Sequence, residues 1–226
     1  MNLAYRAKNE TAVGHIAALF TILVWGTTFV STKVLLQDFT PIEILFVRFV
    51  MGLVALFIIA PKVLGWMGWR HERLFMLAGL FGVTLYYLLE NIALTETLAT
   101  NVGVIVSVSP FFTALLERIV NKGNKLSIQF IIGFVVAMIG IGFISFSETG
   151  LHFSFSGDTL ALLAAGVWAC YSVCMTRIAL LGLSTIKATR RVFEYGILFM
   201  IPVLPLLGFA PEVSAFCNPI NVGNLV

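Results

Sequence analysis

The chain has 226 residues, of which 59% are hydrophobic and only 11% are charged. About 25% of the residues in a soluble domain are charged, and the core of one such domain cannot bury so much apolar surface. These values exclude an ordinary soluble domain and indicate an integral membrane protein. The net charge of +3 is too small to indicate nucleic-acid binding, and the three cysteines do not suggest a disulfide framework.

Seven segments are apolar over roughly the 20 residues that a membrane-spanning helix requires. In chain order they cover residues 14–36, 41–61, 74–94, 99–116, 126–146, 159–181 and about 187–209. They lack the alternation that is typical of barrel strands, so we expect helices. The first segment is too long for the apolar part of a signal peptide and should remain as a membrane helix. The expected fold is an all-α, polytopic membrane helix bundle.

Lysine and arginine residues alternate between the connections of these segments. They occur before the first segment and after the second, the fourth and the sixth. The connections after the first, third and fifth segments have none, and neither does the tail after Phe209. By the positive-inside rule, residues 1–13 should form a cytoplasmic N-terminus of a multi-pass protein in the cell membrane.

The sequence contains an internal repeat. HIAALFTILVWGTTFV (His15–Val30) aligns without gaps with DTLALLAAGVWACYSV (Asp158–Val173), and the separation of 143 residues also relates Arg48 to Arg191. The repeating unit holds five spans, an odd number, so the second copy should enter the membrane from the opposite face. Inverted repeats are typical of secondary transporters. We expect a first repeat over residues 14–147 and a partial second repeat over residues 158–226, with two helices and the start of a third.

Four segments carry a resemblance to a known family. They are VWGTTFVSTKVLL (24–36), PIEILFVRF (41–49), NIALTETLATNVGVIVSVSPFFTALLERI (91–119) and GDTLALLAAGVWACYSV (157–173). The chain resembles the EamA family of the drug/metabolite transporter superfamily. The resemblance implies ten helices in two inverted five-helix halves, and a permease that exports amino acids, metabolites or drugs. The last three helices of that pattern are not represented, and the resemblance assigns no role to Glu90.

Pro110 lies near the middle of the fourth segment, where Ser107 and Ser109 are its neighbours. A proline inside a soluble helix costs roughly 3 kcal/mol. In a membrane helix, hydroxyls, water or neighbouring helices can satisfy the freed backbone groups. We expect a break that lines a solute cavity near the midplane, and an ordinary packing kink is the alternative.

Two charged residues lie within apolar segments and are candidates for transport. Arg48 lies about two turns inside the second segment, a position that is costly unless the side chain faces a cavity, a partner or the interface. We expect it to contact an anionic group of the solute; a pair with Glu43 or a side chain reaching the interface is the alternative. Glu90 is the candidate for proton coupling, and reaching the outer interface or pairing with Arg48 is the alternative.

Two further charged residues are expected to have structural roles. Lys33, near the outer end of its helix, should extend to the interface. Glu194 has the same two interpretations as Glu90, and Arg190 and Arg191, which precede it by one turn, favour a structural pair.

Trp25 and Trp168 lie in the middle of their segments at equivalent positions of the repeat. We expect them to form facing walls of one cavity, with core packing as the alternative. Aromatic and polar side chains could stack on or hydrogen-bond a solute. The full set of expected substrate-binding residues is Trp25, Arg48, Tyr86, Tyr87, Asn91, Asn101, Ser107, Pro110, Trp168 and Tyr171.

The sequence has no phosphate loop, no nucleotide fingerprint and no histidines at metal-ligand spacing. We therefore expect a transporter, not an enzyme, without cofactor or metal. It should move a small organic solute by alternating access, coupled to protons or to solute exchange. Its expected partners are the lipid bilayer and the solute, and a homo-oligomer is left open. A truncated, non-transporting membrane protein or a subunit that needs a partner is the alternative.

Overall fold

The computed structural model describes residues 2–121, 126–148 and 154–225. Every regular element in these ranges is a helix, which confirms the all-α fold class. A π-helical segment, η1 (Leu80–Leu85), and a 3-10 turn, η2 (Pro205–Leu207), accompany the α-helices. The α-helices are α1 (Asn2–Leu35), α2 (Pro41–Ile59), α3 (Trp69–Gly79), α4 (Tyr86–Glu96), α5 (Ala99–Val106), α6 (Ser109–Asn121), α7 (Ile128–Glu148), α8 (Phe155–Ala179), α9 (Thr185–Met200), α10 (Val213–Phe216) and α11 (Pro219–Leu225).

Within the described ranges, five helical segments are long and apolar enough to cross a membrane. They are Gly14–Leu35, Pro41–Ile59, Trp69–Glu96, Ala99–Val120 and Phe155–Ala179, and a shorter apolar helix covers Ile128–Gly140. These segments confirm a polytopic membrane helix bundle.

The seventh predicted segment extends too far. α9 ends at Met200 and does not continue to residue 209. Pro202 has no N–H with which to continue the helical hydrogen bonds. Instead, the N–H groups of Val203 and Leu204 both donate to the carbonyl of Met200, and η2 follows from Pro205. The prediction of one helix over residues 187–209 is therefore wrong in its second half.

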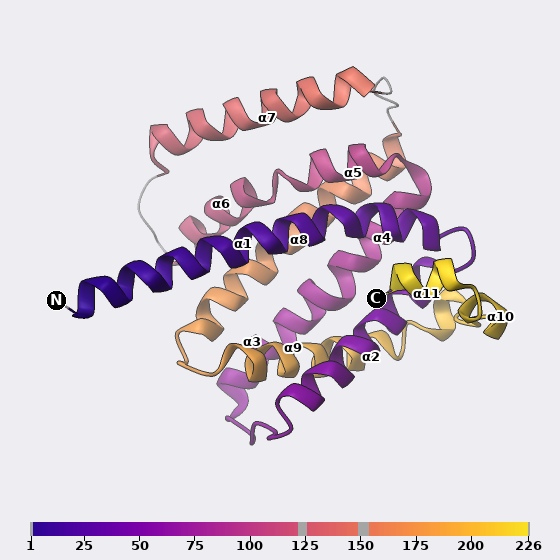
Figure 1. Cartoon of the computed structure of the whole chain (residues 1–226), viewed down its shortest axis with the longest axis horizontal. Helices are drawn as coiled ribbons and strands as arrows, with labels where there is room; N and C mark the ends of the chain where they lie inside the picture. The colour runs from indigo at the N-terminus through magenta and orange to yellow at the C-terminus, as the bar shows by residue number, and fades with distance from the viewer. Residues whose placement is uncertain (1, 122–125, 149–153, 226) are drawn as a thin grey trace.

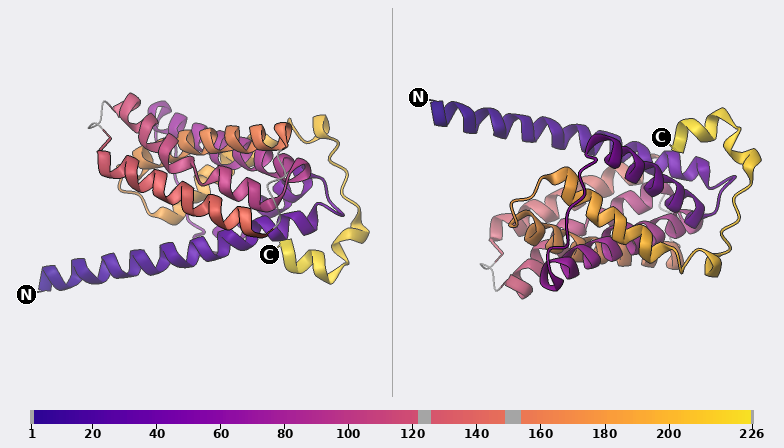
Figure 2. Two further views of the ribbon diagram at one scale, coloured as in Figure 1. Left: turned by 90° about the horizontal axis from the view of Figure 1, so that it is seen from above. Right: turned by 90° about the horizontal axis from the view of Figure 1, so that it is seen from below.

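The helices are arranged around α8, which packs against α3, α4, α5 and α6. Its contact faces carry buried alanines at positions 161, 164, 165 and 169, and such small side chains allow helices to approach closely. The N-terminal part of α1 and the α2–α3 and α8–α9 connections lie at one end of the bundle (Figure 1, Figure 2). The α1–α2 connection and α10 lie at the opposite end.

α3 and α9 cross with their backbones in contact at two glycines. A Cβ atom on Gly79 would lie 2.7 Å from the Gly196 nitrogen and 2.8 Å from the Val192 oxygen. Both neighbours are backbone atoms, which cannot move aside as the end of a side chain can. The crossing therefore requires glycine at position 79.

The third span follows one helical path from α3 through η1 to α4, and η1 lies beside α9. The Thr84 hydroxyl donates to the Gly196 carbonyl at 2.9 Å. A π-helical turn takes more residues than an α-helical turn, so it changes the direction in which the following side chains point. This turn sets the faces of α4 that carry Tyr87, Glu90 and Asn91.

The fourth span is interrupted, as the proline predicts. α5 ends at Val106 and α6 begins at Ser109, so Pro110 is the second residue of a new helix. The first N–H groups of a helix have no intrahelical partner, and proline loses nothing by lacking one there. The Ser109 hydroxyl donates to the Val106 carbonyl and bridges the interruption.

Candidate functional site

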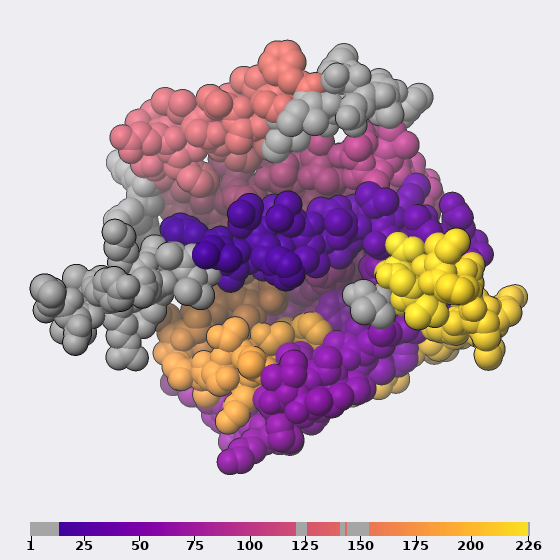
Figure 3. All heavy atoms as spheres, in the orientation of Figure 1, coloured from indigo at the N-terminus to yellow at the C-terminus, as the bar shows by residue number. Residues whose placement is uncertain are grey.

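A cavity of about 580 Å³ lies between α1, α2 and α4. The surface is hollowed between α1 and α2 on the face seen in Figure 3. Its size is within the range of pockets that hold small molecules. The lining residues are Val24, Trp25, Thr27, Thr28, Ser31 and Thr32 of α1; Leu45, Arg48, Phe49, Met51, Gly52 and Ala55 of α2; Tyr87, Glu90 and Asn91 of α4; Phe193 of α9; and Gly223, Asn224 and Leu225 of α11.

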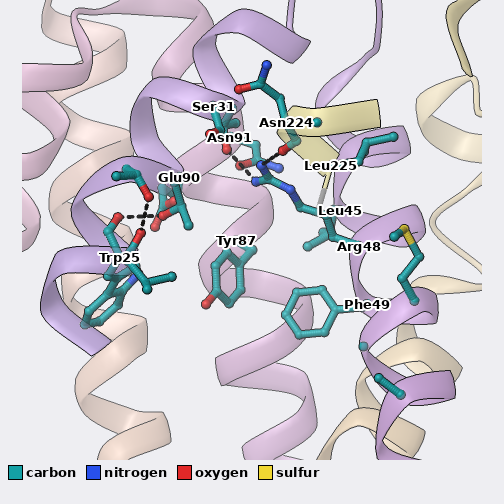
Figure 4. A pocket seen from close by; sticks show the side chains of 18 of the residues that line it. Trp25, Ser31, Leu45, Arg48, Phe49, Tyr87, Glu90, Asn91, Asn224 and Leu225 are labelled. Carbon is teal, nitrogen blue, oxygen red and sulfur yellow. Dashed lines mark hydrogen bonds between the residues drawn. The ribbon is translucent and has the colours of Figure 1, made fainter. Parts of the chain in front are cut away.

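The guanidinium group of Arg48 lies at one side of this cavity (Figure 4). It donates to the Thr32 hydroxyl at 2.7 Å and to the backbone carbonyl of Asn224 at 2.7 Å. Both acceptors are uncharged, and among the described side chains no carboxylate forms an ion pair with Arg48. Two of its five N–H groups are thus used by neutral partners.

The alternative that Arg48 pairs with Glu43 is wrong. The Glu43 carboxylate accepts hydrogen bonds from two backbone N–H groups, that of Thr40 at 2.8 Å and that of Ala210 at 3.0 Å. The first bond belongs to a capping box at the start of α2. Glu43 therefore stabilises the first turn of α2 and the backbone after η2. It does not pair with Arg48, whose guanidinium group lines the cavity.

Glu90 supplies a carboxylate to the cavity wall. Its side chain is only 2% exposed, and its Oε2 atom has no hydrogen-bond partner. The hydroxyl of Tyr86, one turn earlier on α4, is also buried without a hydrogen-bond partner. The cavity thus presents a cation from α2 and an acidic group from α4 (Figure 4).

Aromatic rings form a continuous wall behind and beside these charged groups. Phe49 contacts Tyr87 and Phe193, with ring centroids 5.1 Å and 4.8 Å apart. These three rings and Trp25 line the cavity. The Nε1 group of Trp25 is buried without a hydrogen-bond partner, which is unusual because a buried indole N–H ordinarily finds one.

The two repeat-related tryptophans do not face each other across the cavity. Their ring centroids are 5.0 Å apart, so Trp25 and Trp168 pack directly on one another. Trp168 also contacts Tyr86 at 4.6 Å and Tyr171 at 4.9 Å. The expectation of two facing walls is wrong because Trp168, Tyr86 and Tyr171 form a layer behind Trp25 and support it.

Three predicted site residues lie away from the cavity. Asn101 donates to the Thr97 hydroxyl at 3.2 Å, and Ser107 donates to the Val104 carbonyl at 2.5 Å. Pro110 is exposed on α6 and does not line this cavity. The expectation for these three was incorrect because the interrupted span α5–α6 packs on α8 and is not part of the cavity wall. Of the predicted set, the structure brings Trp25, Arg48, Tyr87, Asn91 and Glu90 together.

Several lining residues were missed in the sequence. Thr27, Thr28, Ser31 and Thr32 form two adjacent pairs that lie about one helical turn apart on α1, which is the spacing of one helix face. A polar stripe in an otherwise apolar helix is a signal that could have identified them. Asn224 contributes its backbone carbonyl, and no sequence pattern predicts that contact.

Two other charged residues stabilise the elements around the cavity. Lys33 donates to the carbonyls of Leu94 and Thr97 and so satisfies the C-terminal end of α4. The ammonium group of Lys33 thus has partners within the protein, and its expected reach to the interface stays a prediction. Glu194 pairs with Arg190 at 3.3 Å and with Arg191 at 3.7 Å, which confirms the predicted structural pair.

The chain is similar to known membrane transporters. The profile of the EamA-like transporter family matches residues 12–146. An uncharacterized transporter of Archaeoglobus fulgidus is 29% identical in an alignment of 225 positions that covers 94% of this chain and 73% of that protein. A probable amino-acid metabolite efflux pump of Escherichia coli is 28% identical over 84% of this chain and 61% of its own length. A probable terminal-alkyne amino-acid exporter of Streptantibioticus cattleyicolor is 25% identical over 92% and 71%, respectively.

Proposed function

Because the chain belongs to the EamA-like transporter family, and is thus a membrane transporter and not an enzyme, we propose that it exports a small zwitterionic solute of the amino-acid class. The observation that carries this proposal is the cavity that holds Arg48, Glu90 and an aromatic wall together. A zwitterion carries both charges in one small molecule, and a site with one cation and one acidic group matches it. The names of two relatives, an amino-acid exporter and an amino-acid metabolite efflux pump, agree with this class.

Arg48 is the group that binds the carboxylate of the solute. A guanidinium can hold both oxygens of a carboxylate with two parallel hydrogen bonds. Its present acceptors, the Thr32 hydroxyl and the Asn224 carbonyl, are neutral. A carboxylate is a stronger acceptor than either, so an incoming solute displaces at least one of them.

Glu90 and Trp25 form the region that binds the ammonium group. The buried Oε2 atom of Glu90 has no hydrogen-bond partner, and an ammonium group would satisfy it. The indole ring of Trp25 can attract the same cation through its face. The side chain of the solute then lies against Phe49, Phe193 and Met51, which favour an apolar or aromatic group.

We propose alternating access as the mechanism, with Glu90 as the proton carrier. The repeat related by 143 residues supports two halves of opposite orientation around one site. An acidic group on the cavity wall can bind either a proton or the ammonium of the solute, but not both at once. Because of this competition, release of the solute on one side would be coupled to uptake of a proton by Glu90. With the N-terminus in the cytoplasm, as we expect, the solute leaves the cell as the proton enters.

Equilibrium binding to the purified protein tests the proposed solute class. Labelled phenylalanine should be displaced by other apolar amino acids, but only weakly by phenethylamine, which lacks the carboxylate, or by phenylpropionate, which lacks the ammonium. Arg48→Gln should weaken amino-acid binding by roughly 10-fold to 100-fold, since hydrogen bonds to charged groups contribute about 1.5–3 kcal/mol. Arg118→Gln removes an exposed arginine of α6 and serves as the control. Equal displacement by all three compounds would contradict the proposed class.

A further inference from the structure

An aromatic and basic surface lies on the α2–α3 connection and the first turns of α3. Trp66 and Trp69 are 64% and 59% exposed, and their rings are stacked with centroids 6.2 Å apart. Lys62, Arg70 and Arg73 are also exposed. We call these five residues the Trp–Arg patch. Arg70 and Arg73 are three residues apart on α3 and Trp69 is four residues from Arg73, so these side chains are neighbours on the helix.

The backbone that carries the patch is fixed from the inner side by α9. Arg190, only 1% exposed, donates to the carbonyls of Ala60 and Lys62, the latter at 2.7 Å. Arg191 donates to the carbonyls of Leu64 and Gly65. These bonds fix carbonyls of the connection on its inner side, and Trp66 is exposed on the outer side whereas Met67 packs against the core. The hydrogen bonds from α9 therefore fix the backbone in a conformation that leaves the tryptophan pair exposed.

The patch has no acidic side chain to balance its charge. Glu72 is the one acidic residue between residues 44 and 89, and its side chain is fully buried. It accepts a hydrogen bond from the Tyr195 hydroxyl at 2.6 Å and one from the Met67 N–H at 3.2 Å, and it lies 3.9 Å from Arg191. The carboxylate of Glu72 is thus used inside the bundle, and the exposed charged side chains between residues 44 and 89 are all basic.

The position of the patch indicates its depth in the membrane. The span Pro41–Ile59 ends before the patch and the span Trp69–Glu96 begins within it, at the end of the bundle that carries the α2–α3 connection (Figure 1). Tryptophan rings concentrate at the level of lipid headgroups, and arginine and lysine at that level attract anionic lipids.

We propose that the Trp–Arg patch is a binding site for the headgroup of an acidic phospholipid. The two tryptophans lie at the boundary between headgroups and acyl chains, and Arg70 and Arg73 contact the phosphate. Because Arg190 and Arg191 connect the same backbone to α9, the bound lipid stabilises the contact between this connection and α9. The site is separate from the solute cavity, and none of its five residues lines that cavity.

Fluorescence quenching by brominated lipids tests the proposal in the full chain. The protein is reconstituted in vesicles that contain either brominated phosphatidylglycerol or brominated phosphatidylcholine. The signal of the patch is obtained by subtracting that of a variant with Trp66→Phe and Trp69→Phe. We expect phosphatidylglycerol to be preferred over phosphatidylcholine at this position by about fivefold for each arginine that contacts the headgroup, and Arg70→Gln with Arg73→Gln should remove most of that preference.

Three controls distinguish a lipid headgroup at the patch from a general effect of surface charge and from free phosphate. Arg118→Gln removes an exposed arginine without a neighbouring tryptophan pair in the described structure, and it should keep the preference. High salt should reduce the preference of the wild type, because it is electrostatic. Equal quenching by the two lipids, or an unchanged preference in the double arginine variant, would overturn the proposal. Loss of the preference on addition of inorganic phosphate at millimolar concentration would also overturn it, since the site would then bind free phosphate.

Discussion

At the scale of single residues, charged groups in apolar segments are the most informative feature of this sequence. The cost of placing Arg48 and Glu90 in a membrane predicts that they face a cavity or a partner, and both line the cavity. Their partners could not be predicted. The carbonyl that accepts a hydrogen bond from Arg48 belongs to the backbone of Asn224, which is far away in the sequence. Every residue has such a carbonyl, so the residue type cannot predict this contact.

Glu90→Gln tests the proposed proton coupling. In proteoliposomes, a pH gradient should accelerate solute movement by the wild type relative to exchange without a gradient. The variant cannot ionise, so it should lose that acceleration even where its exchange rate is also lower. The ratio of the two rates is the measurement, and it is independent of how much protein inserts. An unchanged ratio in the variant would assign the coupling to another group.

Tyr195→Phe tests the buried polar cluster between α3 and α9. The substitution removes the 2.6 Å hydrogen bond to the Glu72 carboxylate and leaves the ring in place. A hydrogen bond to a charged group contributes about 1.5–3 kcal/mol, so the free energy of unfolding in detergent should fall by roughly that amount. Chemical denaturation followed by circular dichroism measures the change. A loss below about 0.5 kcal/mol would show that Arg191 and the Met67 N–H satisfy Glu72 without the tyrosine.

At the scale of elements, the hydrophobicity of the sequence predicts where the helices lie. The sequence predicts the irregularities within these helices only in part. Pro110 predicts the interruption between α5 and α6 because proline lacks an N–H. No proline marks η1, whose sequence LFGVTL remains mostly apolar. Its cause is the crossing with α9, where Thr84 bonds to the Gly196 carbonyl. A tertiary contact of this kind cannot be read from local sequence.

Gly79→Ala tests that crossing. The added Cβ would lie 2.7 Å from a backbone atom of α9, so the helices must move apart, and overpacking of this kind costs about 1–3 kcal/mol. Gly103→Ala is the matched control, because a Cβ at Gly103 of α5 would have no neighbour within 4 Å. It should be neutral or stabilising by up to about 1 kcal/mol. Equal thermal stability of the two variants would contradict the close crossing.

At the scale of the whole molecule, composition alone predicts the membrane helix bundle, and the alternation of basic residues predicts its orientation. In the structure the α2–α3 and α8–α9 connections lie at one end (Figure 2), and these connections or the adjoining helix turns carry Lys62, Arg70, Arg73, Arg177 and Lys187. The boundary of the seventh helix and the residues behind the cavity wall could not be predicted. Both depend on how distant helices pack, and not on the polarity of a segment.

The three cysteines allow the orientation to be measured. Cys217 is exposed after α10, at the end opposite the α2–α3 and α8–α9 connections, whereas Cys170 and Cys174 lie within α8. If the N-terminus is cytoplasmic, a membrane-impermeant maleimide should label intact cells at Cys217. Cys217→Ser should abolish that labelling. Labelling of Cys217 only after the membrane is opened would place the N-terminus outside.

The most direct test of the account is counterflow of an amino acid in proteoliposomes. Vesicles that contain the wild-type protein and unlabelled phenylalanine should accumulate labelled phenylalanine from outside, as should vesicles with the Arg118→Gln control. Arg48→Gln should lower the initial rate by at least about tenfold, in keeping with the loss of charge-assisted bonds to the carboxylate. Counterflow that is equally fast in Arg48→Gln, or no faster than in protein-free vesicles for any apolar amino acid, would contradict transport of a zwitterion through this cavity.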